Sequence, residues 1–134
     1  MNYRIIEGAE NVRLEDVVRL LRTTYWAEKR PMEVTERAMG HSVCYGILLE
    51  GSDALAAFAR VITDYATTFY LCDVVVDPDC RGQGLGKALL GHIFSQPEYK
   101  GLRGFLITRD AHSFYRPFGF DNIGEQGMMR RPGQ

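Results

Sequence analysis

The chain is 134 residues long, 46% of its residues are hydrophobic and 25% are charged, and its formal net charge is -1. This length predicts a single domain, residues 1–134, whose core needs no disulfide or metal ion. The near-zero net charge argues against a protein that binds nucleic acid over an extended basic surface. Three cysteines without a Cys-x-x-Cys pair argue against a disulfide framework or zinc site. We expect a cytoplasmic protein, because the chain shows neither a signal-peptide pattern nor a membrane-spanning apolar run.

The first half of the chain predicts two helices and four strands. Apolar residues recur at helical spacing on one face of the first helix: Leu14, Val17, Val18, Leu20 and Leu21. Pro31 and Gly40 bound the second helix. The predicted strands are 3–7, 43–50, 54–63 and 67–76. The last three are joined by turns so short that they must form an antiparallel meander.

The second half of the chain changes its pattern. A loop at 77–83 leads to a helix of about 84–96, and a strand at 104–108 follows. A strand, a helix and a strand at this spacing form a right-handed parallel crossover. A short helix at 111–117 comes next. Residues from Gly119 onward suit a return strand, and Met128-Met129-Arg130 would finish the sheet.

The most specific segment is Arg81-Gly82-Gln83-Gly84-Leu85-Gly86-Lys87, between the third meander strand and its helix. A glycine-rich helix start leaves backbone N–H groups without intrahelical partners, and the helix dipole adds positive charge there. Such a turn binds phosphate or pyrophosphate. The spacing does not fit a P-loop, because Arg81 stands where its first glycine is required and Ala88 where its Ser or Thr is required. It does not fit a dinucleotide fingerprint either, because Lys87 stands where the third glycine is required. A helix start that binds no ligand is the alternative.

Arg81, Gly84 and Gly86 form an Arg-x-x-Gly-x-Gly pattern that resembles the coenzyme A pyrophosphate loop of the GNAT (Gcn5-related) N-acetyltransferases. The order of elements resembles the GNAT fold along nearly the whole chain, most closely over about 67–120. The resemblance implies an α+β, mixed α/β domain with the GNAT acyl-CoA N-acyltransferase fold. Its central sheet would have six or seven strands and would splay between the fourth and fifth strands. About four helices would accompany the sheet. The pantetheine arm of acetyl-CoA, the implied cofactor, would lie in that gap.

The resemblance places the cofactor-binding residues at the end of the third meander strand, on the glycine loop and after the following strand. They are Val74, Val75, Val76, Arg81, Gly82, Gln83, Gly84, Leu85, Gly86, Lys87, Thr108, Ala111, His112 and Tyr115. Many family members have Asn where this chain has Thr108-Arg109-Asp110, so Thr108 or Asp110 is the expected replacement. A His112 that merely faces solvent is the alternative.

Phe114-Tyr115-Arg116-Pro117-Phe118-Gly119-Phe120 resembles the family's Tyr-x-x-x-Gly-Phe pattern. The resemblance makes Tyr115 the general acid that protonates the coenzyme A thiolate as it leaves. A phenol, with an ordinary pKa of about 10, can donate while staying protonated at neutral pH. The alternative is that Tyr115 only packs in the core.

Asp73 is an acidic residue inside an otherwise apolar strand, and burying a carboxylate is costly unless it is paired or functional. Asp73 is therefore a candidate base or amine anchor, because the attacking amine must lose its proton. A structural ion pair with Arg60 is the alternative. The resemblance places the acceptor pocket at the first helices and the strand tips: Tyr25, Trp26, Arg60, Asp64, Tyr70 and Asp73. Asp64 also suits a turn.

The charges of this pocket leave two acceptor types open. Acidic groups beside an aromatic wall suit a cationic amine, whereas Arg30 and Arg60 suit a substrate that carries a carboxylate. The predicted function is transfer of the acetyl group of acetyl-CoA to a primary amine of a small molecule or peptide, by direct attack in a ternary complex. A non-catalytic acyl-CoA-binding or regulatory domain is the alternative. We expect no metal, nucleic-acid or membrane partner, and a homodimer is compatible with the sequence.

Overall fold

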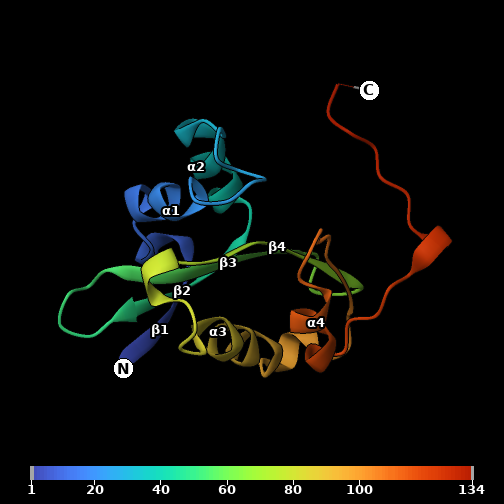
Figure 1. The fold of residues 1–134 in the computed structure, drawn as a ribbon. Coiled ribbons are helices and arrows are strands. Elements are labelled where there is room, and N and C mark those ends of the chain that lie inside the picture. The colour runs from blue at the N-terminus through green and yellow to red at the C-terminus, as the bar shows by residue number, and fades with distance from the viewer. Residues whose placement is uncertain (1, 134) are drawn as a thin grey trace.

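The computed structural model describes residues 2–133 as one mixed sheet with helices on both faces (Figure 1). Helices α1 (Leu14–Leu21) and α2 (Met32–Gly40) lie on one face, and α3 (Leu85–Phe94) and α4 (His112–Tyr115) lie on the other. The strands, in their order across the sheet, are β1 (Tyr3–Glu7), β2 (Val43–Leu49), β3 (Leu55–Thr63), β4 (Thr68–Val76) and β5 (Arg103–Phe105). This is the predicted α+β architecture.

The strand pairing follows from the lengths of the connections. The first four strands are antiparallel neighbours, as the short turns require of the meander. β5 pairs with β4 in parallel, after the crossover through α3. The predicted meander and crossover are both confirmed. None of the helices in the described part of the chain has the length and apolar character needed to cross a membrane.

Two apolar clusters, one on each side of the sheet, hold the layers together. Leu89, Leu90 and Ile93 of α3 are fully buried against one face. Val17 and Leu20 of α1 are fully buried against the other face. Each such side chain contributes roughly 1.5–3 kcal/mol through its burial. The periodic apolar faces of the two helices therefore fix which sides of α1 and α3 meet the sheet.

β4 contains a bulge at Asp73. Phe58 pairs with Val75 and Arg60 pairs with Cys72, so two residues of β4 lie opposite one residue of β3. The φ of Asp73 is 54°, in the left-handed region that strand residues rarely adopt. Leu71, before the bulge, packs with α3, whereas Val75, after it, packs with α1. The bulge therefore interrupts the alternation of β4 at its acidic residue.

β4 and β5 diverge, as the resemblance to the GNAT fold implies. Their ladder runs only from the pair Thr68 and Arg103 to the pair Tyr70 and Phe105, whereas β4 continues to Val76. Within residues 2–133, the rest of β4 has no strand partner on the β5 side. β5 itself is shorter than the predicted strand at 104–108, because the divergence removes its partner.

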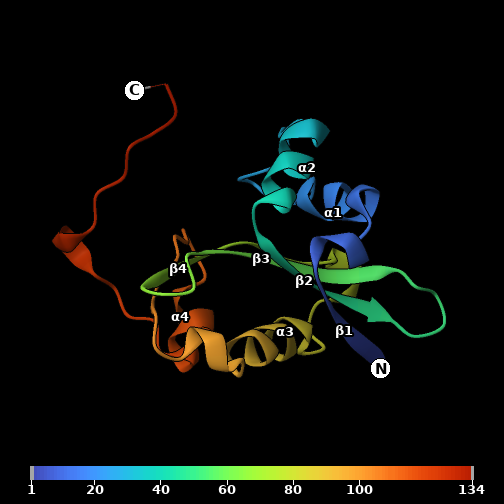
Figure 2. The same cartoon turned by 180° about the vertical axis from the view of Figure 1, so that it is seen from behind.

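The sheet has five strands, so the prediction of six or seven is wrong. The described residues after Gly119 contain no strand, and residues 121–133 are all exposed. This segment extends away from the body of the molecule in both views (Figures 1 and 2). A strand needs a neighbour for its backbone hydrogen bonds, and the segment has no strand beside it among residues 2–133. The predicted strands from Gly119 and at Met128-Met129-Arg130 therefore do not form.

Candidate active site

A cleft of about 990 Å³ lies where β4 and β5 diverge. Its walls come from the loop after α1, the second half of β4, the glycine loop with the start of α3, and the segment after β5. Its volume is at the upper end of the range for small-molecule sites. The cleft therefore joins segments that are distant in the sequence.

The glycine loop presents unpaired backbone donors to this cleft. Gly82 and Gly84 have φ values of 80° and 78°, which other residues rarely adopt. In the described structure the backbone N–H groups of residues 82–87 donate to no protein atom. A Cβ atom at Gly82 or Gly84 would meet nothing within 4 Å, so the space in front of the loop is open. The loop therefore fits an anionic group such as a pyrophosphate.

Arg19 of α1 holds the segment that leads into the glycine loop. The sequence did not reveal this role of Arg19. Its Nη1 donates to Asp77 Oδ2 at 2.8 Å, and its Nη2 donates to the Leu55 carbonyl at 2.9 Å. Burial alone would raise the pKa of Asp77, but the Asp79 N–H and the Arg19 guanidinium outweigh burial and lower it. The end of β4 is therefore tied to α1 before the loop begins.

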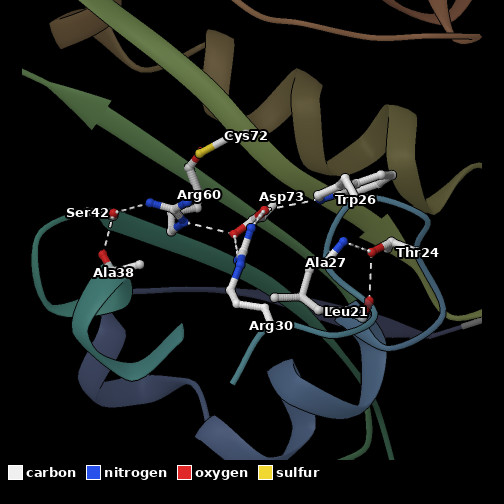
Figure 3. Close-up of polar contacts among 10 residues, drawn as sticks. All are labelled: Leu21, Thr24, Trp26, Ala27, Arg30, Ala38, Ser42, Arg60, Cys72 and Asp73. Carbon is white, nitrogen blue, oxygen red and sulfur yellow. Dashed lines mark hydrogen bonds and ion pairs between the residues drawn. The ribbon is translucent and has the colours of Figure 1, made fainter. Parts of the chain in front are cut away.

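The carboxylate of Asp73 accepts four hydrogen bonds (Figure 3). Oδ2 accepts from Arg30 Nη1 at 2.8 Å and from Arg60 Nε at 3.0 Å. Oδ1 accepts from Arg30 Nη2 at 3.1 Å and from Trp26 Nε1 at 3.2 Å. A carboxylate has about four acceptor positions, so this carboxylate is saturated. The ion pair with Arg60, the alternative that the sequence left open, is present, and Arg30 adds a second.

These contacts decide the protonation state of Asp73. Asp73 is only 5% exposed, and burial alone would raise the pKa of its carboxyl. The hydrogen bonds and charges of Arg30 and Arg60 outweigh burial, so the pKa is lowered. The hydrogen bond from Arg30 to Asp73 likewise raises the pKa of Arg30. At neutral pH the three side chains therefore carry one net positive charge.

Two aromatic residues connect this cluster to the opposite wall. Tyr25 and Trp26 pack edge to face, with ring centroids 5.0 Å apart. The guanidinium of Arg109, in the segment after β5, lies 3.7 Å from the centroid of the Tyr25 ring. This cation–π contact joins the loop after α1 to the loop after β5. No local pattern in the sequence points to Arg109, because the contact depends on how the two loops meet.

Tyr115 lines the cleft, and its ring packs against that of Phe114 with the centroids 5.0 Å apart. Burial raises the pKa of its phenol to about 12, and charges from Tyr25 and Asp110 act in the same direction. The phenol is therefore protonated throughout the physiological range. Cys72 lines the same cleft, and burial raises the pKa of its thiol to about 11.

Comparison with known proteins identifies the family. The model of the acetyltransferase (GNAT) family matches residues 14–120. The chain belongs to the GNAT acetyltransferase family. It is 30% identical to the uncharacterized N-acetyltransferase ycf52 of Porphyra purpurea over 95% of this chain and 76% of that protein. It is 31% identical to ycf52 of Gracilaria tenuistipitata var. liui, over 90% of this chain and 70% of that one.

Solved structures agree with this assignment. A GNAT-family protein from Xanthomonas campestris pv. campestris has a TM-score of 0.88 and 37% identity, covering 98% of this chain and 93% of its own. Glucosamine-6-phosphate N-acetyltransferase from Arabidopsis thaliana has a TM-score of 0.72 at 20% identity, and covers all of both chains. The second match, at this low identity, shows the fold alone. This protein is therefore an acyltransferase with the GNAT fold.

The GNAT cleft brings together most of the residues that the sequence singled out. Most of the cofactor candidates line it: Val74, Val75, Val76, Arg81, Gly82, Gly84, Leu85, Gly86, Lys87, Thr108, Ala111 and Tyr115. The substrate candidates that line it are Tyr25, Trp26, Arg60, Tyr70 and Asp73. Thr108 is engaged within its own turn, since its Oγ1 accepts from the Ala111 N–H at 3.0 Å. Asp110 also lines the cleft of this GNAT protein.

Three of the predicted residues lie outside the cleft lining. Gln83 is on the glycine loop with its side chain exposed, and His112 lines a second cavity beyond β5. Asp64 caps the turn between β3 and β4, where its Oδ1 accepts from the N–H groups of residues 66–68. Hydrogen bonds from Thr67 lower the pKa of Asp64. In this GNAT protein Asp64 therefore has the turn role that the sequence offered as an alternative.

Proposed function

We propose that this GNAT acetyltransferase transfers the acetyl group of acetyl-CoA to a primary amine of a small molecule or peptide. The observation that carries the proposal is that the backbone N–H groups of residues 82–87 donate to no protein atom and lie beside the gap between β4 and β5. A pyrophosphate and an extended thioester arm fit these two adjoining features. Tyr115 lies along the same cleft, where the thioester would end.

The cofactor would be held mainly by backbone. The N–H groups of residues 82–87 and the dipole of α3 would bind the pyrophosphate, with the side chains of Arg81 and Lys87 nearby. The unpaired edge of β4 at Val74 and Val76 offers backbone partners for the pantetheine arm. Acetyl-CoA, when bound, supplies an activated thioester. A β4 backbone N–H beside the bulge would polarise its carbonyl.

The chemical step would be direct transfer. The acceptor would first release its ammonium proton to bulk water, because a primary amine is mostly protonated at neutral pH. The neutral nitrogen would then bond to the carbonyl carbon as the carbon–sulfur bond breaks. Tyr115 would give its proton to the departing sulfur, and the proton that the nitrogen loses as the amide forms would return to Tyr115 through water. Cys72 is not required as a nucleophile, because at a pKa of about 11 it is a thiol rather than a thiolate at neutral pH.

Asp73 would position the acceptor side of the cleft rather than take the proton. Its four acceptor positions are filled by Arg30, Arg60 and Trp26, and its pKa is lowered. Both facts make it a poor base at neutral pH. The net positive charge of the cluster instead favours an acceptor that carries a carboxylate or another anionic group beside its amine.

Release of the coenzyme A thiol tests this function. Purified protein is incubated with acetyl-CoA and a panel of amines, half of them bearing a carboxylate or phosphate, and free thiol is followed with a chromogenic reagent. We expect amine-dependent release, fastest with the anionic members. Tight binding of acetyl-CoA without release for any amine would favour the non-catalytic acyl-CoA-binding domain. Longer acyl donors in the same assay define the acyl preference.

A further inference from the structure

Asp77, the residue that follows β4, organises the turn that leads into the glycine loop. Its Oδ1 accepts from the Asp79 N–H at 2.9 Å, and its carbonyl oxygen accepts from the Cys80 N–H at 2.8 Å. Its own N–H donates to the Ala56 carbonyl of β3 at 2.8 Å. The start of the glycine loop therefore depends on the orientation of this one residue.

Arg19 reaches Asp77 from the other layer of the molecule. α1 lies on the face of the sheet opposite α3 (Figure 1), yet Arg19 Nη1 is 2.8 Å from Asp77 Oδ2. Its Nη2 is 2.9 Å from the Leu55 carbonyl oxygen, at the first residue of β3. The Asp77 side chain is only 17% exposed, so water screens this ion pair weakly. Arg19 does not line the cleft, and Asp77 is its one link to the glycine loop.

Arg81 is the second cation whose charge reaches this carboxylate. Burial alone would raise the pKa of Asp77, and the Asp79 N–H lowers it. The hydrogen bond from Arg19 and the charges of Arg19 and Arg81 lower it further. Arg81 lines the cleft and forms no ion pair within residues 2–133. Its charge is available to an anion in the cleft as long as Asp77 has another partner.

Loss of Arg19 would make Asp77 and the anion compete for Arg81. A half-buried carboxylate without a partner is costly, so Asp77 would turn toward the cation that remains. Turning would withdraw Oδ1 from the Asp79 N–H and disturb the turn, and it would draw Arg81 out of the cleft. Both effects come from the charge of Asp77, so both should disappear when that charge is removed.

We propose that Arg19 is a positioning residue for acetyl-CoA: it holds Asp77, so that the turn keeps the glycine loop in place and Arg81 stays free for the pyrophosphate. This role rests on the proposed function, since it takes residues 82–87 as the pyrophosphate site. It gives α1 a second task. The helix leads to the acceptor wall at Tyr25, and through Arg19 it also sets the affinity for the cofactor.

Isothermal titration calorimetry with acetyl-CoA tests this role. Arg19→Ala should raise Kd about tenfold, because the cofactor must then separate Arg81 from Asp77 and restore the turn. The double variant Arg19→Ala/Asp77→Asn should bind within a few-fold of the wild type, since Asn keeps the Oδ1 acceptor and lacks the charge. Arg22→Ala removes an exposed arginine at the end of the same helix, and this control should keep the wild-type Kd. Thermal melting checks that all variants fold.

Hydrogen exchange of the ligand-free protein, followed by NMR, gives a readout that does not need the cofactor. The N–H groups of residues 79 and 80 should exchange faster in Arg19→Ala than in the wild type, and the double variant should restore their protection. Unchanged exchange in Arg19→Ala would contradict the hold on the turn.

The binding results separate this role from the proposed function. A wild-type Kd in a folded Arg19→Ala would overturn the role of Arg19 and leave the proposed function intact. A loss of affinity that the double variant does not reverse would do the same, because the charge of Asp77 would then not be its cause. A wild type that does not bind acetyl-CoA would overturn the proposed function, and the role of Arg19 with it.

Discussion

Arg30 binds the carboxylate of Asp73 at two points, with Nη1 2.8 Å from Oδ2 and Nη2 3.1 Å from Oδ1. Paired hydrogen bonds of this kind fix the orientation of both groups. Arg30 comes from the loop between α1 and α2, and Asp73 from the bulge of β4. The pair therefore ties the helical layer to the point where the sheet opens.

Substitution of Asp73 should destabilise the fold strongly. In Asp73→Asn the charge that compensates Arg30 and Arg60 is lost in a buried place, and we expect a loss of about 3 kcal/mol in the free energy of unfolding. Urea denaturation at neutral pH measures it. Asp53→Asn is a matched control: Asp53 has the same φ of 54° and pairs with Arg4, but its side chain is 86% exposed. The control should change stability by less than about 0.5 kcal/mol, and equal losses would contradict the account.

The same carboxylate should make stability depend on pH. The pKa of Asp73 is lower in the folded protein than its ordinary value of 3.8, so ionised Asp73 favours the folded state. This contribution is fully present above the unfolded pKa and is lost as the pH falls through the folded pKa. Urea denaturation at a series of pH values should show the gap between wild type and Asp73→Asn closing below about pH 4. A gap that stays constant in acid would show that the ion pairs do not stabilise the fold.

Removal of the Tyr115 hydroxyl should slow turnover without weakening cofactor binding. For Tyr115→Phe we expect kcat to fall roughly 10²-fold or more and the Kd for acetyl-CoA to stay unchanged. Because the pKa of Tyr115 is about 12, its deprotonation should not limit the wild-type rate at physiological pH. Tyr65→Phe, at a turn residue 57% exposed, is the control. Normal turnover in Tyr115→Phe would remove the phenol from the mechanism.

Local sequence patterns predicted most of the fold. The apolar face of α1, the three meander strands and the glycine loop are each encoded by neighbouring residues, and all appear close to the predicted bounds. The error lies after Gly119, where the residues suit a strand but the described part of the chain supplies no strand to pair with it. Strand propensity without a partner strand is not enough to build a ladder.

The contacts at Asp73 show why the site was only partly predictable. Its acidic character in an apolar strand marked it as unusual, and Arg60 on the neighbouring strand was a foreseeable partner. Arg30 and Trp26 lie 43 and 47 residues away in a segment without periodicity. Their convergence on one carboxylate depends on how α1 and α2 pack on the sheet. No local sequence pattern encodes this packing.

Acetyl-CoA binding, measured by isothermal titration calorimetry, tests the central claim most directly. Gly84 has a φ of 78° and open space before it, so in Gly84→Glu a carboxylate would stand where the pyrophosphate is expected. Gly91→Glu makes the same change in α3, at an exposed glycine whose Cβ would also meet nothing. Circular dichroism checks that both variants fold. We predict that wild type and Gly91→Glu bind acetyl-CoA equally and that Gly84→Glu does not bind; equal affinity in a folded Gly84→Glu would contradict the account.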